Sequence, residues 1–208
     1  MNNLEQELQG AFSHLEKKIS QARTLHIRYE MMEEHRLFLI RQSILSIYAA
    51  WEGFLKESLR LYLGALNQLD ICYDELSDEY LAYQTDKICA FKDSRKELRV
   101  IQKVSVQLLE TYKGIVNFDT KINTESNANL SITNSLLRKL SLQELSGNYQ
   151  KGLDKLLFFR NSTAHGEDTI PIEQKDLDTF GLLVQNLSSD LILSILDGFT
   201  DRVYLKTA

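Results

Sequence analysis

The spacing of apolar residues predicts helices along almost the whole chain. Over residues 2–33 the apolar side chains recur every three or four positions, as on one face of an amphipathic helix. This seam consists of Leu4, Leu8, Phe12, Leu15, Ile19, Ala22 and Leu25–Ile27. A broader apolar face runs from Leu37 to Leu66 without a helix breaker. A helix with so wide an apolar face must pack against several partners.

The remaining pattern predicts five further helices around one irregular insertion. Residues 117–134 are rich in Asn, Ser and Thr, which bond to the local backbone and favour loops and caps. This insertion is expected to hold a short extended piece near Ala128–Ile132. The predicted helices are Glu75–Ala90, Lys92–Gly114, Thr133–Leu140, Tyr149–His165 and Glu173–Gly198. Ser77 is expected to cap the first of them. The second is expected to turn inward Leu98, Ile101, Val104-Ser105, Leu108-Leu109 and Tyr112.

Neither flank of the insertion carries a complete core pattern, so we expect one all-α domain over residues 1–208, with an N-terminal helix at 2–33 and a core at about 36–200.

The composition of the chain also supports a helical fold. The chain has one Pro and nine Gly in 208 residues, where average usage gives about ten and fifteen. An all-β domain needs more of both in its turns. The hydrophobic fraction of 43% and charged fraction of 25% are those of a folded globular protein.

Charge and cysteine content narrow the setting. A net charge of −5 argues against binding nucleic acid over the whole surface, although it allows a local basic cleft. Cys72 and Cys89 form no C-x-x-C pair or Cys/His cluster, so we expect no disulfide framework, no zinc site and no cofactor. The polar N-terminus and the absence of a long apolar run predict a cytoplasmic chain without signal peptide or membrane span.

One segment, residues 160–166, brings together polar side chains that could take part in catalysis. Arg160, Asn161 and His165 follow an apolar run at a predicted helix end, and Gly166 comes next, where a left-handed residue often ends a helix. Arginine offers a charged donor fork to phosphate oxygens, and histidine exchanges protons near neutral pH. Asn161 and His165, four apart, share a helix face, whereas Arg160 and His165 are about 140° apart around the helix. On spacing alone, a capping His and a surface Arg explain the pattern as well.

These residues carry a resemblance. The string Arg160-Asn161-x-x-x-His165 resembles the R-x4-H motif of HEPN-superfamily ribonucleases, an all-α bundle family. Ser46–Phe54, with Tyr48, Trp51 and Glu52, is similar to the "Y-x-x-W-E-G-F" helix of a prokaryotic branch related to the RiboL-PSP-HEPN group. The segment Asn127–Leu130 also resembles that branch, so the likeness spans roughly residues 36–200.

The resemblance implies a homodimeric, metal-independent endoribonuclease, often a toxin or phage-defence effector with an antitoxin or defence-system partner. Arg160 would stabilise the phosphate charge, His165 would transfer a proton or hold the phosphate, and Asn161 would assist. Some HEPN toxins carry a tyrosine two residues after the histidine for nucleotidylation. Glu167 stands there instead, which speaks against that mechanism.

Other candidates have competing interpretations. Trp51 is expected in the core. Glu52 either pairs with an arginine such as Arg160 or is a solvated helix residue. Gly53 in mid-helix predicts a close helix crossing. A basic stripe either contacts RNA or is a solvated helix face, and it consists of Lys92, Arg95, Lys96, Arg99 and Lys103.

Two other function classes stay open at this stage. One is a catalytically silent HEPN-type module that dimerises or binds a nucleotide, RNA or protein. The other is a helical scaffold in which Arg160 and His165 only cap a helix.

Overall fold

The computed structural model of the chain describes residues 3–89, 98–124, 127–166 and 171–206. These residues form seven α-helices and two short 3-10 helices, and their β-pairing is limited to two isolated bridges. The fold is all-α, as predicted. The helices are α1 (Asn3–Arg28), α2 (Glu33–Leu66), η1 (Tyr73–Glu75), α3 (Asp78–Cys89), α4 (Leu98–Thr111), α5 (Leu130–Lys139), η2 (Gly147–Tyr149), α6 (Gln150–Ala164) and α7 (Gln174–Thr200).

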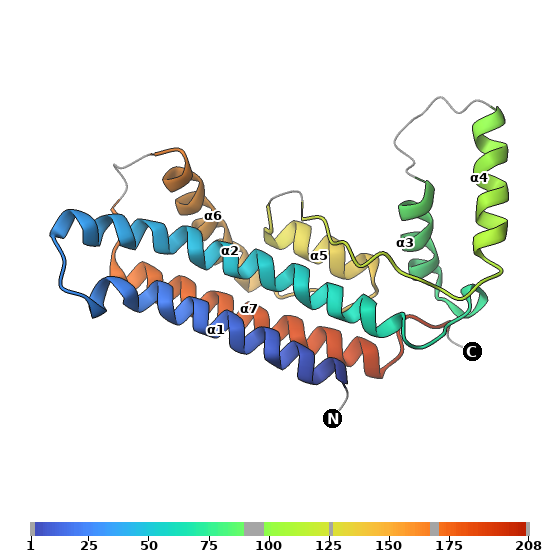
Figure 1. The fold of residues 1–208 in the computed structure, drawn as a ribbon, viewed down its shortest axis with the longest axis horizontal. Helices are drawn as coiled ribbons and strands as arrows, with labels where there is room; N and C mark the ends of the chain where they lie inside the picture. Colours follow the sequence, from blue (N-terminus) through green and yellow to red (C-terminus); the bar gives the residue numbers. More distant parts are fainter. Residues whose placement is uncertain (1–2, 90–97, 125–126, 167–170, 207–208) are drawn as a thin grey trace.

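Three long helices form the main layer of the molecule. α1 runs antiparallel to α2 and α7 and packs against both (Figure 1). Their facing sides carry the apolar seams expected from the sequence, and Trp51 and Phe180 are among the largest side chains that are fully buried. The helix α7 is long and apolar enough to cross a membrane by length and composition. Half of its most apolar window is buried within the protein, as expected of a core helix.

The end of the α1–α2 hairpin differs from the predicted seam. The expected helix over residues 2–33 ends at Arg28, and Leu25 and Ile27 are exposed. His26 is buried instead, and its Nε2 bonds to Gln174 Oε1 of α7. The amide of Gln174 donates through Nε2 to the carbonyl oxygen of Arg23 and to Asp178 Oδ1, so its Oε1 must accept from His26. A polar contact therefore closes this end of the bundle.

The Asn-rich segment lies along α2 and is fixed there by side chains of that helix and of Asn67, the residue that follows it. Asn67 donates from Nδ2 to the carbonyl oxygen of Phe118 at 3.0 Å and accepts from the Phe118 amide at 2.7 Å. Further along, the Ala128 carbonyl accepts from Trp51 Nε1 at 2.8 Å. Backbone groups that lack a helix or sheet partner are thus satisfied by side chains. The predicted extended piece at Ala128–Ile132 is wrong, because Asn129 caps α5 and residues 130–132 form its first turn.

The helices α3 and α4 rise together at one end of the molecule, away from the three long helices (Figure 1). The sequence predicted a helix over Lys92–Gly114 with an inward apolar face. Residues 92–97 lie outside the described residues, and the described helix ends at Thr111. Ile101 and Leu109 on it are 45% and 64% exposed, and Ser105 is also exposed. The inward assignment is therefore wrong for these three residues. α4 packs chiefly against α3, which is too small to cover them.

Two local predictions are also wrong. The helix expected from Glu75 starts at Asp78, and the Ser77 hydroxyl is buried without a hydrogen-bond partner in the described structure, so Ser77 does not cap α3 through its side chain. Gly53 does not mark a close helix crossing, since a Cβ placed there meets no heavy atom within 4 Å.

Candidate functional site

The candidate site lies at the C-terminal end of α6, which packs against α2 and α7. Apolar residues Leu153, Leu156 and Phe159 anchor the helix in the core. His165 is the C-cap residue, and its amide donates to the Asn161 carbonyl at 3.0 Å. Gly166 follows with φ of +74°, a left-handed conformation that favours glycine. The helix therefore ends where the sequence predicted, directly after Ala164.

Arg160 is turned toward α2 and is half-buried. Its Nη1 donates to Asn161 Oδ1 at 2.8 Å, and its Cζ lies 4.9 Å from the centroid of the Tyr48 ring. The carboxamide of Asn161 is thereby oriented with Oδ1 toward Arg160, which leaves its Nδ2 donors at the exposed surface. The two residues together present N–H donors at one edge of α6, which suits an anionic ligand such as a phosphate.

His165 lies on the same exposed helix face as Asn161. Its imidazole is exposed and has no hydrogen bond to any residue in the described ranges. The hydrogen bond from the Arg160 guanidinium goes to Asn161 and not to His165. The structure thus joins Arg160 to Asn161 and leaves His165 open to solvent.

Glu52 is tied to its own helix and to the Asn-rich segment. Its Oε1 accepts from Lys56 Nζ at 2.6 Å and from the Thr124 hydroxyl at 2.7 Å. Burial alone raises the pKa of Glu52, but bonds from Lys56, Thr124 and Tyr48 outweigh it and lower the pKa below its usual value. The predicted pairing of Glu52 with Arg160 is not formed, because Lys56 takes this place.

Tyr48 lies between Arg160 and Glu52. Its hydroxyl accepts from the Ala128 amide at 2.8 Å. Burial raises the pKa of this hydroxyl, and the neighbouring Glu52 raises it further, against the opposing effects of the Ala128 amide and the Arg160 charge. Tyr48 is therefore a neutral phenol at neutral pH.

Sequence reasoning missed Tyr48, Lys56 and Thr124 as neighbours of the site. The pairing of Glu52 with Lys56 could have been predicted from the sequence, since residues four apart share a helix face. The contact of Tyr48 with Arg160 has no local signal, because it joins two helices that are distant in the sequence.

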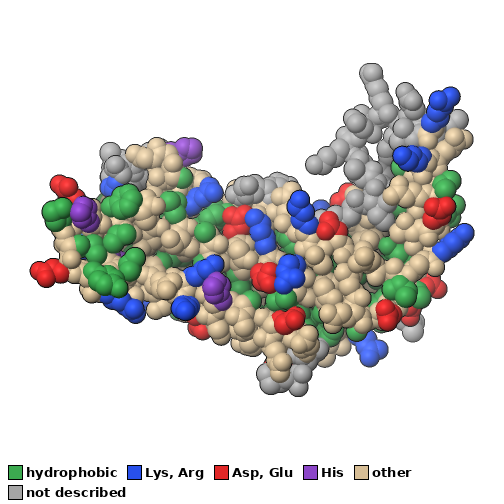
Figure 2. All heavy atoms as spheres, in the orientation of Figure 1, with side chains coloured by type: hydrophobic (Ala, Val, Ile, Leu, Met, Phe, Trp, Pro, Cys, Tyr) green, Lys and Arg blue, Asp and Glu red, His purple; other side chains and the backbone are tan. Residues whose placement is uncertain are grey.

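The structure describes only two residues of the predicted basic stripe. Lys92, Arg95 and Lys96 lie outside the described residues, as does Glu167. Arg99 and Lys103 are exposed on α4, which stands at the opposite end of the molecule from α6 (Figure 1). Basic and acidic side chains are interspersed over the face in view in Figure 2. Arg99 and Lys103 therefore lie away from Arg160 within one chain, and contact of the stripe with RNA stays a prediction.

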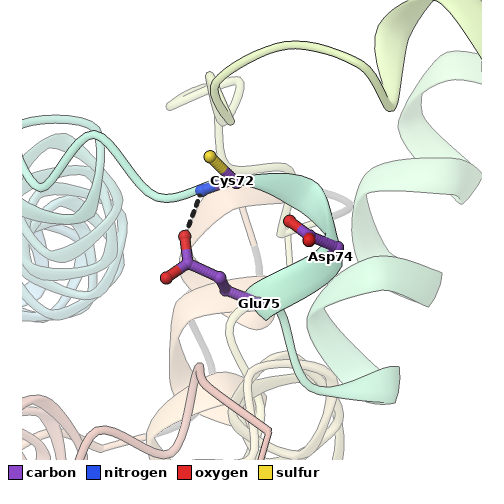
Figure 3. Close-up of side chains that lie close together, drawn as sticks. All are labelled: Cys72, Asp74 and Glu75. Carbon is purple, nitrogen blue, oxygen red and sulfur yellow. Dashed lines mark hydrogen bonds between the residues drawn. The ribbon is translucent and has the colours of Figure 1, made fainter.

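A second cluster lies around η1. The side chains of Cys72, Asp74 and Glu75 are exposed, and their ligand atoms lie within 4.8 Å of one another (Figure 3). The Cys72 amide donates to Glu75 Oε2 at 2.7 Å, as part of a capping box for η1. This bond accounts for the position of Glu75, so we assign no metal site to the cluster.

Comparison with known proteins adds one finding. The model of the MAE_28990-like HEPN family matches residues 4–204. This match covers all of α1 except its first residue, the whole of the other helices and the candidate site. No curated protein and no solved structure matches the chain.

Proposed function

Because the chain belongs to the MAE_28990-like HEPN family, we propose that it is a metal-independent endoribonuclease that serves as a toxin or phage-defence effector. HEPN proteins include many nucleases and RNA-binding proteins, so membership of the family supports a function that acts on RNA. The observation that supports catalysis is the end of α6. There the Arg160–Asn161 pair presents its donors beside an exposed and unbonded His165.

The proposed reaction uses the ribose 2′-hydroxyl as nucleophile. The 2′-oxygen attacks the adjacent phosphorus, the bond to the 5′-oxygen breaks, and the products carry a 2′,3′-cyclic phosphate and a 5′-hydroxyl. Arg160 stabilises the charge that develops on the phosphate oxygens, which is commonly a large contribution to catalysis. His165 transfers a proton, and Asn161 orients Arg160 and donates to the phosphate.

A homodimer would complete this chemistry. One proton must leave the 2′-hydroxyl and another must reach the 5′-oxygen, and each chain supplies a single histidine at the site. The exposed face of α6 carries Phe158, which is 55% exposed, together with Asn161 and His165. Aromatic residues are enriched in protein–protein interfaces, so we propose this face as the contact between the two copies. A second copy packed on this face would bring its own Arg160 and His165 to the same cleft.

The test is RNA cleavage in EDTA by the purified protein and by Arg160→Ala and His165→Ala. Each variant is expected to lose at least about 100-fold in rate, because Arg160→Ala removes the stabilisation of phosphate charge and His165→Ala removes the group that transfers a proton. The matched controls are Arg60→Ala, which removes an exposed arginine paired with Glu57, and His14→Ala, which removes an exposed histidine of α1. Cleavage by the wild type that both site variants retain in full would contradict the proposal.

A silent binding module is the second candidate function. It is favoured by the hydrogen bond of Arg160 to Asn161 instead of His165 within one chain and by the net charge of −5. Binding of RNA by the wild type without cleavage would identify this function. Growth arrest on expression that disappears in His165→Ala would instead support the toxin or defence role.

A further inference from the structure

The ring of Tyr48 forms a support beneath the Arg160 guanidinium. The Cζ atom lies 4.9 Å from the ring centroid, within the range in which a cation is attracted to the face of an aromatic ring. Tyr48 is 2% exposed, whereas Arg160 is half-buried and reaches the surface. The ring and the hydrogen bond to Asn161 together set the direction in which this long, flexible side chain leaves α6.

The support is itself held in place from several sides. The Ala128 amide donates to the Tyr48 hydroxyl at 2.8 Å, and Trp51 Nε1 donates to the Ala128 carbonyl at 2.8 Å. Next to Tyr48, Glu52 is bound by Lys56 and by Thr124. One turn of α2 thus binds the Asn-rich segment and orients the aromatic ring at the same time. These contacts fix the orientation of the Tyr48 ring against which Arg160 packs.

We propose that Tyr48 is the positioning residue of Arg160, holding its donor fork toward the phosphate of bound RNA without touching the substrate itself. This inference rests on the proposed nuclease function, which supplies the phosphate. It goes beyond that function because it assigns the orientation of Arg160 to a buried residue of another helix. A catalytic group must be held close to its productive geometry, and a displacement of about 1 Å can cost about 100-fold in rate.

Two substitutions separate the ring from the hydroxyl. Tyr48→Leu removes the aromatic face and is expected to lower kcat by about 100-fold with a small change in KM, because Arg160 is still present but no longer oriented. Tyr48→Phe keeps the ring and is expected to retain most of kcat. The matched control is Tyr62→Leu, which removes an equally buried tyrosine of α2 that bonds to Tyr80 instead. All variants are assayed well below their unfolding temperatures.

A spectroscopic readout tests the same inference without RNA. The Tyr48 ring current should shift the Arg160 side-chain resonances upfield in the wild type and in Tyr48→Phe. The shift should be lost in Tyr48→Leu and kept in Tyr62→Leu. Absence of the shift in the wild type would overturn the inference, whether or not the protein cleaves RNA.

The outcomes for the two proposals differ. If the wild type cleaves RNA and Tyr48→Leu has the same kcat as Tyr62→Leu, the nuclease function stands and the positioning role is refuted. If the wild type shows the ring-current shift but cleaves no RNA in EDTA, the nuclease function fails and the positioning role in catalysis fails with it. A selective loss of kcat together with loss of the shift in Tyr48→Leu supports both.

Discussion

At the scale of single residues, Gly53 inside α2 lowers the stability of the protein. A glycine inside a helix costs about 1 kcal/mol relative to alanine, because its backbone loses more freedom on folding. Some helix positions need a glycine because a neighbouring side chain leaves no room for a Cβ. Gly198 is such a position, since a Cβ there would collide with Cδ2 of Leu142. At Gly53 no heavy atom lies within 4 Å of the Cβ position. The glycine is therefore not required by packing within one chain.

Gly53→Ala is expected to raise the free energy of unfolding by about 1 kcal/mol. The measurement is the urea midpoint of the variant against the wild type. Gly198→Ala serves as the contrast and should lower the midpoint, since Leu142 would have to move. A Gly53→Ala protein that is no more stable than the wild type would mean that another molecule, or another part of the chain, fills the space beside Gly53.

The candidate site illustrates what could be predicted residue by residue. Arg160, Asn161 and His165 could be placed at a helix end because their spacing and Gly166 are local signals. The role of Asn129 as a cap agrees with the general preference of asparagine for such positions. The contact of Tyr48 with Arg160 could not be predicted, because it depends on how α6 crosses α2 and not on either segment alone.

At the scale of elements, the start of α7 is held by charge. Asp176 accepts from the Glu173 amide at 3.0 Å and from Lys155 Nζ at 3.1 Å. Lys155 also lies over the rings of Phe159 and Phe180, so it links α6 to α7. Burial alone raises the pKa of Asp176, but the Glu173 amide and Lys155 outweigh it and hold the pKa below its usual value. The carboxylate is thus more favoured in the folded than in the unfolded chain.

Asp176→Asn is expected to lower the free energy of unfolding by about 1 kcal/mol at neutral pH, because it removes the negative charge of the capping box from the first turn of α7 and the ion pair with Lys155. Because the folded pKa is depressed, the wild-type advantage is full above the ordinary aspartate pKa and disappears as pH falls through the folded value. Urea unfolding of both proteins as a function of pH would show the gap closing in acid. A gap that stays constant would show that charge is not the cause. Asp154→Asn, on an exposed aspartate of α6, is the control.

The helix α4 shows where reasoning from an apolar pattern stops. Periodicity correctly identified a helix and its apolar residues, but it carries no information on whether another element covers them. α4 packs chiefly on α3, and Leu109 stays 64% exposed. In contrast, the apolar faces of α1, α2 and α7 are wide enough, and the helices long enough, to cover one another. Burial could therefore be predicted for the long helices and not for the short one.

At the scale of the whole molecule, the all-α class followed from the scarcity of Pro and Gly together with the apolar periodicity. The arrangement of the helices did not. Three long helices bury one another, and α6 crosses α2 so that its C-terminal turn stays open (Figure 1). That open turn carries the proposed chemistry, and the proposed homodimer would cover it.

Phe158→Ser is expected to weaken the proposed homodimer without unfolding the chain, because Phe158 is 55% exposed and contributes little to the core. Sedimentation velocity over a range of protein concentrations would show a dimer for the wild type and a shift toward monomer for the variant. The control is Leu193→Ser, an equally exposed apolar residue of α7, 58% exposed. A wild type that stays monomeric at every concentration would contradict the dimer.

The two attachments of the Asn-rich segment to α2 have a consequence for how this family can diversify. Asn67 holds the segment at Phe118, and the turn from Tyr48 to Glu52 holds it at Thr124 and Ala128. Chain inserted between these attachments would bulge outward without displacing the ring under Arg160. The segment could thus be lengthened, and with it the surface that a substrate or inhibitor meets, while its anchors stay the same: Tyr48, Trp51 and Glu52 of α2 and Asn67 just after it.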